Sequence, residues 1–166
     1  MNNYIQPLCL LLFLLVSSCS SDSLKISKNP SEKVKVIEQQ INKVLDKWHQ
    51  AATDAEFETY FDLMEESSIF IGTDAKENWT KSEFKSFSKP FFDAGKAWTF
   101  KVIERSVYFN ERKDTAWFDE LLDTWMGTCR GSGVLEKTND SWKIKHFVLS
   151  VTVPNDLMDQ FISLKK

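Results

Sequence analysis

The sequence predicts an α+β fold, a cone-shaped barrel of three N-terminal helices packed on a strongly curved, mostly antiparallel sheet. Two observations carry this prediction. Residues 31–91 place apolar side chains at helical spacings of three and four, whereas residues 115–153 form runs rich in Trp, Phe, Val, Ile and Leu, separated by turn-forming residues. Helices gathered on one side of a bent sheet leave a cone-shaped cavity between the two layers.

The first half of the chain supplies the helices. A long helix is predicted over Ser31–Ala52, and a second helix after a cap at Asp54. A short strand follows at Ser68–Gly72, and then a polar loop that Trp79 closes. A third helix begins at Thr80 or Ser82 and carries three phenylalanines. Pro90 is expected to end or bend it, because proline cannot donate a helical hydrogen bond.

The second half supplies the sheet. Lys96–Phe109 is predicted to be a long strand whose pattern breaks near residues 104–106. Three further antiparallel strands are predicted at Ala116–Trp125, Cys129–Lys137 and Ser141–Val153. Pro154 ends the last of them, and a short closing helix follows. No repeat or linker divides the chain, so one domain is expected.

The N-terminal residues predict export. Leu8–Val16 is almost unbroken apolar sequence, yet it is too short to span a bilayer, which needs about 20 residues. Two serines and Cys19 follow, which resembles a bacterial lipoprotein signal, although residues 1–7 carry no Lys or Arg. We predict a lipoprotein signal peptide over 1–18, lipidation of Cys19, a tether over 19–30 and the folded domain over 31–166. The chain would then lie in the cell envelope, anchored by its N-terminal lipid. An ordinary secretory signal is the alternative.

Composition excludes several kinds of partner. The formal net charge of −3 is not the basic composition that would suggest binding to nucleic acid. With Cys9 in the signal and Cys19 lipidated, only Cys129 remains, so no internal disulfide is expected. The two histidines are not in a metal-binding pattern and no glycine-rich phosphate loop precedes a helix, so we predict no metal and no cofactor.

Several short motifs resemble one known family. They are IFIGTD and ENWTKSEF within Ile69–Phe84, AWFDE at Ala116–Glu120, RGSGVL at Arg130–Leu135, WKIKHFVLS at Trp142–Ser150, and residues 154–156. Together and in this order they resemble a SnoaL-like family of the nuclear-transport-factor-2-like (ketosteroid-isomerase-like) superfamily. The resemblance implies a cone-shaped fold that is commonly dimeric through the sheet. The superfamily includes isomerases, polyketide cyclases, dehydratases and non-catalytic binding domains, so the fold does not fix the function.

Strand parity selects His146 as a candidate. Lys143 and Lys145 should face water, which places His146 on the covered face and leaves Phe147 and Leu149 outside. A homodimer through the outer sheet face would cover these two side chains. His146 is then either a general base or ligand contact, or a core histidine with its hydrogen bonds satisfied.

Glu120 and Arg130 are a second candidate pair, because a turn near Trp125 sets them opposite each other. Facing inward, they would anchor a polar ligand, with Glu120 as base; otherwise they are an ion pair that fixes strand register. If side chains alternate regularly across the next hairpin, Arg130 lies on the water-facing side of the sheet. A bulge at Gly131 or Gly133 would instead turn Arg130 inward.

The loop before Trp79 holds the third candidate. The resemblance implies an aspartate base near this part of the fold, and Asp74 matches by position; the alternative is a turn carboxylate. His49 follows the apolar stripe of the first helix by one position, so it borders either the cavity or solvent, and we expect solvent.

Two functions remain open. The predicted pocket residues are Trp48, Trp79, Trp98, Phe118 and Arg130. One function is a binding module for a small hydrophobic ligand in this pocket. The other is a cofactor-free isomerase, cyclase or dehydratase that uses His146, Glu120 or Asp74 as base. A third, weaker hypothesis is a structural domain whose cavity its own side chains fill.

Overall fold

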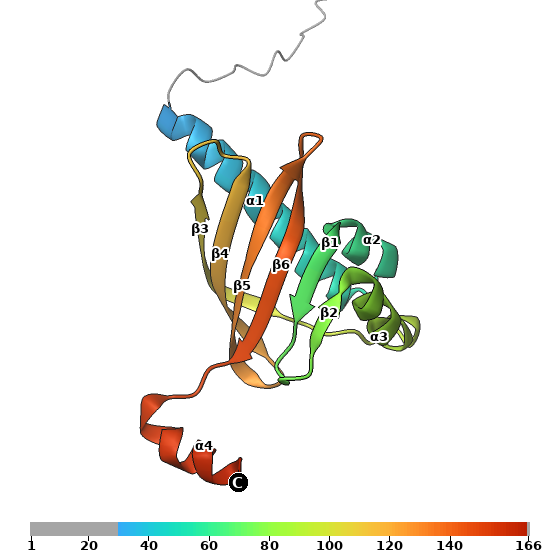
Figure 1. Ribbon diagram of the computed structural model, residues 1–166, viewed down its shortest axis with the longest axis vertical. Helices are drawn as coiled ribbons and strands as arrows, with labels where there is room; N and C mark the ends of the chain where they lie inside the picture. The colour runs from blue at the N-terminus through green and yellow to red at the C-terminus, as the bar shows by residue number, and fades with distance from the viewer. Residues whose placement is uncertain (1–29, 166) are drawn as a thin grey trace, which may run out of the picture.

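The computed structural model describes residues 30–165. The predicted signal peptide, Cys19 and residues 19–29 of the predicted tether lie outside this range. In the described part, three helices pack against one face of a curved, six-stranded sheet (Figure 1), so the predicted α+β fold is confirmed. We call the face under the helices the inner face, and the opposite one the outer face.

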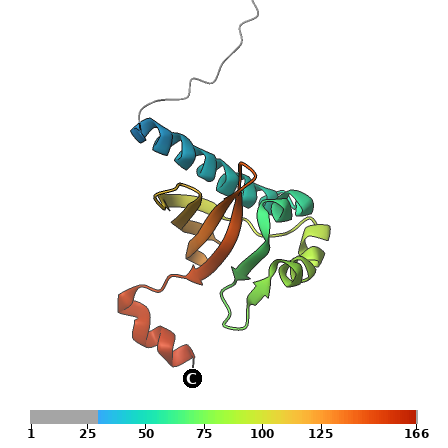
Figure 2. The same cartoon turned by 45° about the horizontal axis from the view of Figure 1, so that its top comes forward.

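The helices are α1 (Pro30–Thr53), α2 (Phe57–Asp62), α3 (Lys81–Asp93) and α4 (Met158–Leu164), which follows the 3-10 turn η1 (Asn155–Leu157). Figures 1 and 2 show α1 running obliquely across the sheet, whereas α4 stands apart from the body. The burial of Ile41, Leu45 and Trp48 confirms the apolar stripe on α1. No helix in the described residues is both long and apolar enough to cross a membrane.

The strands are β1 (Met64–Ile71), β2 (Asn78–Thr80), β3 (Lys101–Phe109), β4 (Thr115–Thr124), β5 (Gly127–Thr138) and β6 (Ser141–Val151). They lie in the order β2-β1-β6-β5-β4-β3. The β1–β6 pair is parallel and the others are antiparallel. The first strand therefore lies beside the last one, which brings the segment after α2 next to the end of the domain.

Several element boundaries differ from the prediction. Thr80 is the N-cap of α3, where it forms a capping box with Glu83, so the earlier of the two expected starts is the observed one. The helix does not end at Pro90 but runs to Asp93. Helix α2 follows Glu56 rather than a cap at Asp54, and β2 forms within the segment expected to be a loop.

One extra residue in β6 reverses the predicted parity of that strand. Val134 pairs with His146 but Leu135 pairs with Ile144, so Lys145 is an unpaired bulge residue. Beyond the bulge, Phe147 and Leu149 face the inner side and are buried. The expectation that these two side chains lie outside, with His146 inside, is therefore wrong.

Glycines in β5 let the sheet pack closely against its own inner side chains. Gly131 and Gly133 lie on the inner face in regular alternation, so neither forms the bulge considered above. A Cβ at Gly133 would lie 2.4 Å from the carbonyl oxygen of His146 and 2.8 Å from the Phe118 ring. The first of these atoms belongs to the backbone and cannot rotate away.

Gly133→Ala is therefore expected to lower the free energy of unfolding by about 1–3 kcal/mol, because the added methyl group overpacks the core. Urea denaturation followed by circular dichroism measures this change. The matched control is Ser132→Ala on the outer face, where we expect a change within ~0.5 kcal/mol. Equal losses in both variants would contradict the close approach at Gly133.

Candidate functional site

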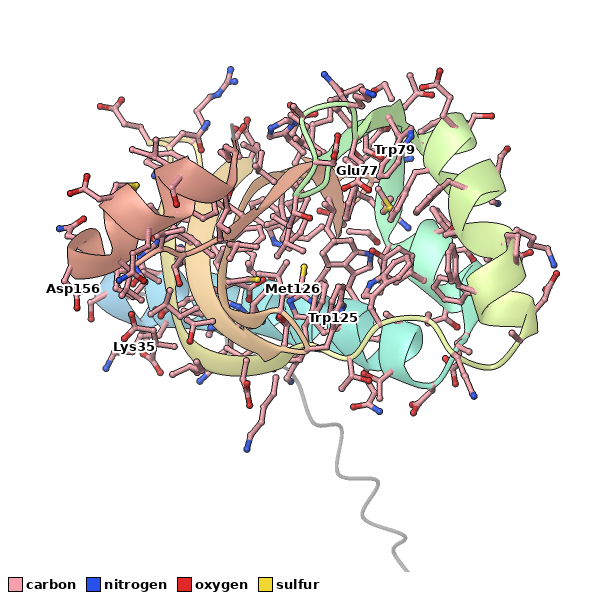
Figure 3. The ribbon with its side chains drawn as sticks, turned by 90° about the horizontal axis from the view of Figure 1, so that it is seen from below. Lys35, Glu77, Trp79, Trp125, Met126 and Asp156 are labelled. Atoms are coloured by element: carbon pink, nitrogen blue, oxygen red, sulfur yellow. The ribbon has the colours of Figure 1, made fainter. Side chains whose placement is uncertain are left out.

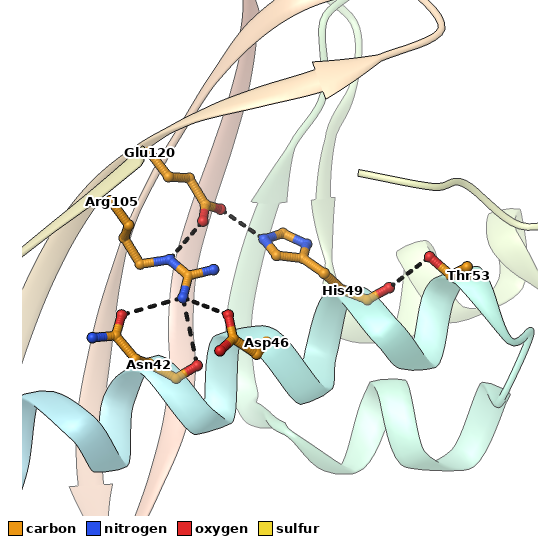
Figure 4. Close-up of polar contacts among 6 residues, drawn as sticks. All are labelled: Asn42, Asp46, His49, Thr53, Arg105 and Glu120. Carbon is orange, nitrogen blue, oxygen red and sulfur yellow. Dashed lines mark hydrogen bonds and ion pairs between the residues drawn. The ribbon is translucent and has the colours of Figure 1, made fainter. Parts of the chain in front are cut away.

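A group of polar side chains lies between α1 and the inner face of β3 and β4 (Figure 4). Glu120 on β4 has no exposed surface. His49 Nε2 donates to Glu120 Oε1 at 2.8 Å, and Arg105 Nε donates to Oε2 at 2.7 Å. Arg105 Nη1 also donates to the side chains of Asp46 at 2.8 Å and Asn42 at 3.2 Å. We call these five residues the Glu120 cluster.

The cluster keeps Glu120 ionised. Burial is the largest single influence on the pKa of Glu120, and it raises the pKa because a charge is poorly solvated inside the protein. The hydrogen bonds and charges of His49 and Arg105 together outweigh burial, so the pKa of Glu120 lies below its usual range. Both oxygens of this carboxylate accept hydrogen bonds, one from His49 and one from Arg105, which hold the carboxylate in a fixed position.

Two members of the cluster were not expected there. His49 was expected to face solvent, but it is 5% exposed, and its ring packs 5.9 Å from Phe100 and 6.5 Å from Phe147. Arg105 was not singled out in the sequence at all. It lies directly opposite Glu120 in the β3–β4 register, within the segment where the strand pattern breaks. The signal that could have identified Arg105 is a charged residue at a strand position that faces inward.

Arg130 takes no part in the cluster. It pairs with Leu121 in the register and lies on the outer face, where its guanidinium is 3.1 Å from the Asp119 carboxylate. Both side chains are about half exposed. The predicted inward pair of Glu120 and Arg130 is therefore wrong, because strand β5 keeps regular alternation through its glycines.

The other two candidate bases also lie away from the inner face. His146 lies on the outer face because of the bulge at Lys145. Asp74 is exposed in the β1–β2 loop, where its carboxylate accepts the backbone N–H of Lys76 at 2.8 Å. The structure thus does not bring His146, Glu120 and Asp74 together.

A separate apolar pocket opens at the end of the sheet where the β1–β2 loop faces the β4–β5 turn. Its aromatic lining residues are Phe70, Trp79, Phe84, Phe87, Trp98, Phe100 and Trp125. Thr73, Glu77, Met126 and Leu149 complete the side-chain lining, and the cavity has a volume of about 150 Å³. Figure 3 looks toward this end, with Glu77 and Trp79 on one side and Trp125 and Met126 on the other. We call this cavity the aromatic pocket.

Apart from Arg130, which lies on the outer face, the predicted pocket residues divide into two groups. Trp79 and Trp98 line the aromatic pocket. Trp48 and Phe118 lie instead in the core, where both pack against Phe147 at ring distances of 4.9 Å and 6.2 Å. They were misassigned because the space under α1, where a cavity was expected, is filled by side chains.

Phe100 connects the two regions. Its ring contacts His49 in the Glu120 cluster and also lines the aromatic pocket, whereas His49 is not among the lining residues. The polar cluster and the pocket are thus neighbours that an aromatic ring separates. In the described residues, no group of three or more His, Cys, Asp or Glu side chains could hold a metal ion, and Cys129 is buried as a free thiol.

Comparison with protein families finds a match to the SnoaL-like domain over residues 41–154. This range holds all of the Glu120 cluster and all of the aromatic pocket. The comparison with curated proteins found no match.

Solved structures share the fold at low sequence identity. An NTF2-like protein of unknown function from Pseudomonas putida is 14% identical, covers 74% of this chain and 91% of its own, and has a TM-score of 0.61. The association domain of CaMKII from C. elegans is 23% identical, with coverages of 74% and 100% and a TM-score of 0.59. A Mycobacterium tuberculosis protein of unknown function is 11% identical, with coverages of 78% and 79% and a TM-score of 0.62. These likenesses establish the fold alone.

Removing the charge of Glu120 should destabilise the domain. Glu120→Gln leaves the buried Arg105 without its inner carboxylate, so we expect a loss of roughly 3 kcal/mol in unfolding free energy at pH 7. Because the folded pKa of Glu120 is lowered, the unfolded chain takes up this proton first as the pH falls. The stabilisation is present above the usual glutamate pKa of about 4.3 and is lost as the pH falls through the folded pKa.

Urea denaturation of both proteins between pH 7 and pH 3 measures this effect. The difference between wild type and Glu120→Gln should shrink on acidification. The control is Asp119→Asn, which removes the exposed partner of Arg130 and should cost at most about 1 kcal/mol. A difference for Glu120→Gln that stays constant with pH would contradict the assignment.

Proposed function

Since the chain belongs to the SnoaL-like domain family, we propose that it is a binding domain that holds a small, largely apolar molecule in the aromatic pocket. Folds of this kind carry both binding and catalytic functions, so the function has to be inferred from the geometry of the site. The observation that carries the proposal is an open pocket in which seven aromatic side chains meet a few polar groups.

The size of the pocket limits the ligand. The aromatic pocket has a volume of about 150 Å³. Apolar cavities of this volume in other proteins hold one molecule the size of benzene. Sites for drug-sized ligands usually measure roughly 300–1,000 Å³. The ligand, or the part of it inside the pocket, is therefore about one ring in size, and a longer molecule would extend through the opening.

The polar groups favour binding over catalysis. Glu120 is ionised, buried and bonded through both oxygens, and none of the three predicted bases lines the aromatic pocket. A general base has to lie within about 2.6–3.2 Å of the proton that it removes, or one water molecule away. Because none of the three lines the pocket, none is placed to remove a proton directly from a ligand there.

A second candidate function is favoured by one observation, the pairing of His49 with Glu120. A carboxylate bonded to one imidazole nitrogen fixes the ring, and the other nitrogen is then oriented for proton transfer. In this alternative the chain is a cofactor-free isomerase, cyclase or dehydratase with His49 as base. Phe100 would have to move aside before His49 could reach a ligand.

We also propose that the outer face mediates a homodimer. Phe147 and Leu149 are buried on the inner face and do not contribute to it, but another apolar row lies on the outer face. Tyr108 and Trp117 stack 6.1 Å apart and are nearly half exposed, and Val134 continues the row across the sheet.

Lipid anchoring at Cys19 in the cell envelope remains part of the proposal, since the sequence alone supports it.

Indole N–H signals make the binding proposal testable by NMR. Titration with toluene, a neutral one-ring probe, should shift the signals of Trp79, Trp98 and Trp125, which line the pocket. The signals of Trp117 on the outer face and the buried Trp142 are internal controls and should stay in place. Shifts of equal size in all of these signals, or in none, would contradict a binding site here.

Native mass spectrometry can then search for the natural ligand after incubation with extract from the source cells. If a retained compound is converted to a product, the two functions separate. Turnover that is lost in His49→Asn and kept in the control His146→Asn would favour the enzyme. A compound that is retained unchanged supports the binding domain.

The dimer proposal is tested by sedimentation velocity. Trp117→Lys places a charge in the centre of the apolar row and should convert a dimer into monomers. The control Trp125→Lys changes an equally large residue that is 84% exposed at the β4–β5 turn, and it should leave the dimer intact. A wild-type chain that sediments as a monomer at high concentration would rule the interface out.

A further inference from the structure

The aromatic pocket combines many aromatic rings with a single charge. Among the described residues that line it, Glu77 is the one ionisable side chain, and no Lys, Arg or His lines the cavity. From this combination we propose that the ligand is a small organic cation, such as a quaternary or tertiary ammonium compound. This inference rests on the proposed binding function and specifies its chemical class.

The rings provide the first part of the argument. The face of an aromatic ring carries partial negative charge, so a cation bound among rings gains attraction that a neutral molecule of the same shape does not. Indole is the strongest of the natural ring systems in this respect, and three lining residues are tryptophans. Trp125 is the most available of them, because it is 84% exposed and stacks on no other ring in the described residues.

The carboxylate provides the second part. Glu77 lies on the β1–β2 loop across the opening from Trp125 (Figure 3). It forms no ion pair with the described residues, and its Oε2 accepts only the backbone N–H of Asp74, at 3.1 Å. A carboxylate at the mouth of an apolar cavity, without a basic partner, favours a positively charged ligand and disfavours an anion.

A purely structural role for Glu77 is the competing explanation. Its side chain folds back over Gly72, where a Cβ would lie 2.2 Å from Glu77 Oε2, and its bond to Asp74 helps to shape the loop. A glutamine could keep both features, since its side-chain oxygen still accepts the Asp74 N–H. Glu77→Gln therefore removes the charge and leaves the loop contacts, which separates the two explanations.

The test compares two soluble probes of nearly the same shape. Choline carries a trimethylammonium group, and 3,3-dimethylbutan-1-ol replaces its nitrogen with carbon and is neutral. We expect choline to bind about tenfold or more tightly than the neutral alcohol, as measured by NMR shifts of the Trp125 indole signal. In Glu77→Gln the affinity for choline should fall about tenfold, while the affinity for toluene stays the same.

The matched control is Asp74→Asn, which removes one negative charge from the same loop at a residue that does not line the pocket. It should leave choline binding within about twofold of wild type, because an exposed charge outside the cavity is screened. Trp125→Ala should weaken choline more than toluene, without a change in unfolding free energy above ~0.5 kcal/mol.

Equal affinities for choline and the neutral alcohol, or a Glu77→Gln variant that still binds choline like wild type, would overturn the inference. If toluene still binds in either case, the pocket keeps its proposed function and only its charge preference is wrong. If choline, the alcohol and toluene all fail to bind, the proposed function fails together with the inference.

Discussion

The buried charge of Glu120 is the constraint on which the arrangement of the domain depends. A carboxylate with no exposed surface is stable only if charged and hydrogen-bonding groups surround it. These groups come from two different places, His49 on α1 and Arg105 on β3, and Arg105 in turn reaches back to Asp46 on the helix. The cluster therefore fixes the rotation of α1 on the sheet, as well as the spacing between the two layers. Apolar packing alone would define that position less strictly.

The two ends of the inner face have different physical characters. Under the middle of α1 the space is filled by charged groups and core rings. At the end of the sheet where the β1–β2 loop faces the β4–β5 turn, aromatic side chains surround an open cavity. Phe100 stands at the boundary between them. This separation allows the pocket to be apolar while the charges that hold the layers remain out of contact with a ligand. Changes at an exposed pocket residue such as Trp125 can then alter binding without touching the Glu120 cluster, whereas Phe100 contacts both regions.

The sequence predicted the fold class and the order of nearly all elements, because helical spacing and strand alternation are local signals. It failed where the signal was not local. The bulge at Lys145 cannot be read from the alternation around it, and it moves His146 to the outer face. Glu120 was recognised as important, but its partners are distant in the chain, with His49 lying 71 residues away. Trp79 and Trp98 were chosen as aromatic residues near the expected cavity, and only the structure shows how they meet Trp125 from the opposite turn.

The parallel pairing of β1 with β6 has a consequence for how the chain folds. Strand β1 is formed early in the sequence, but one of its two neighbours is the last strand of the sheet. Its main hydrogen-bonding edge thus stays unpaired until residues 141–151 have left the ribosome. Contacts between such distant segments slow folding, since the entropy of closing the long loop must be overcome first. The domain should therefore fold only after β6 has been synthesised, and a chain that lacks β6 would expose the edge of β1 to aggregation.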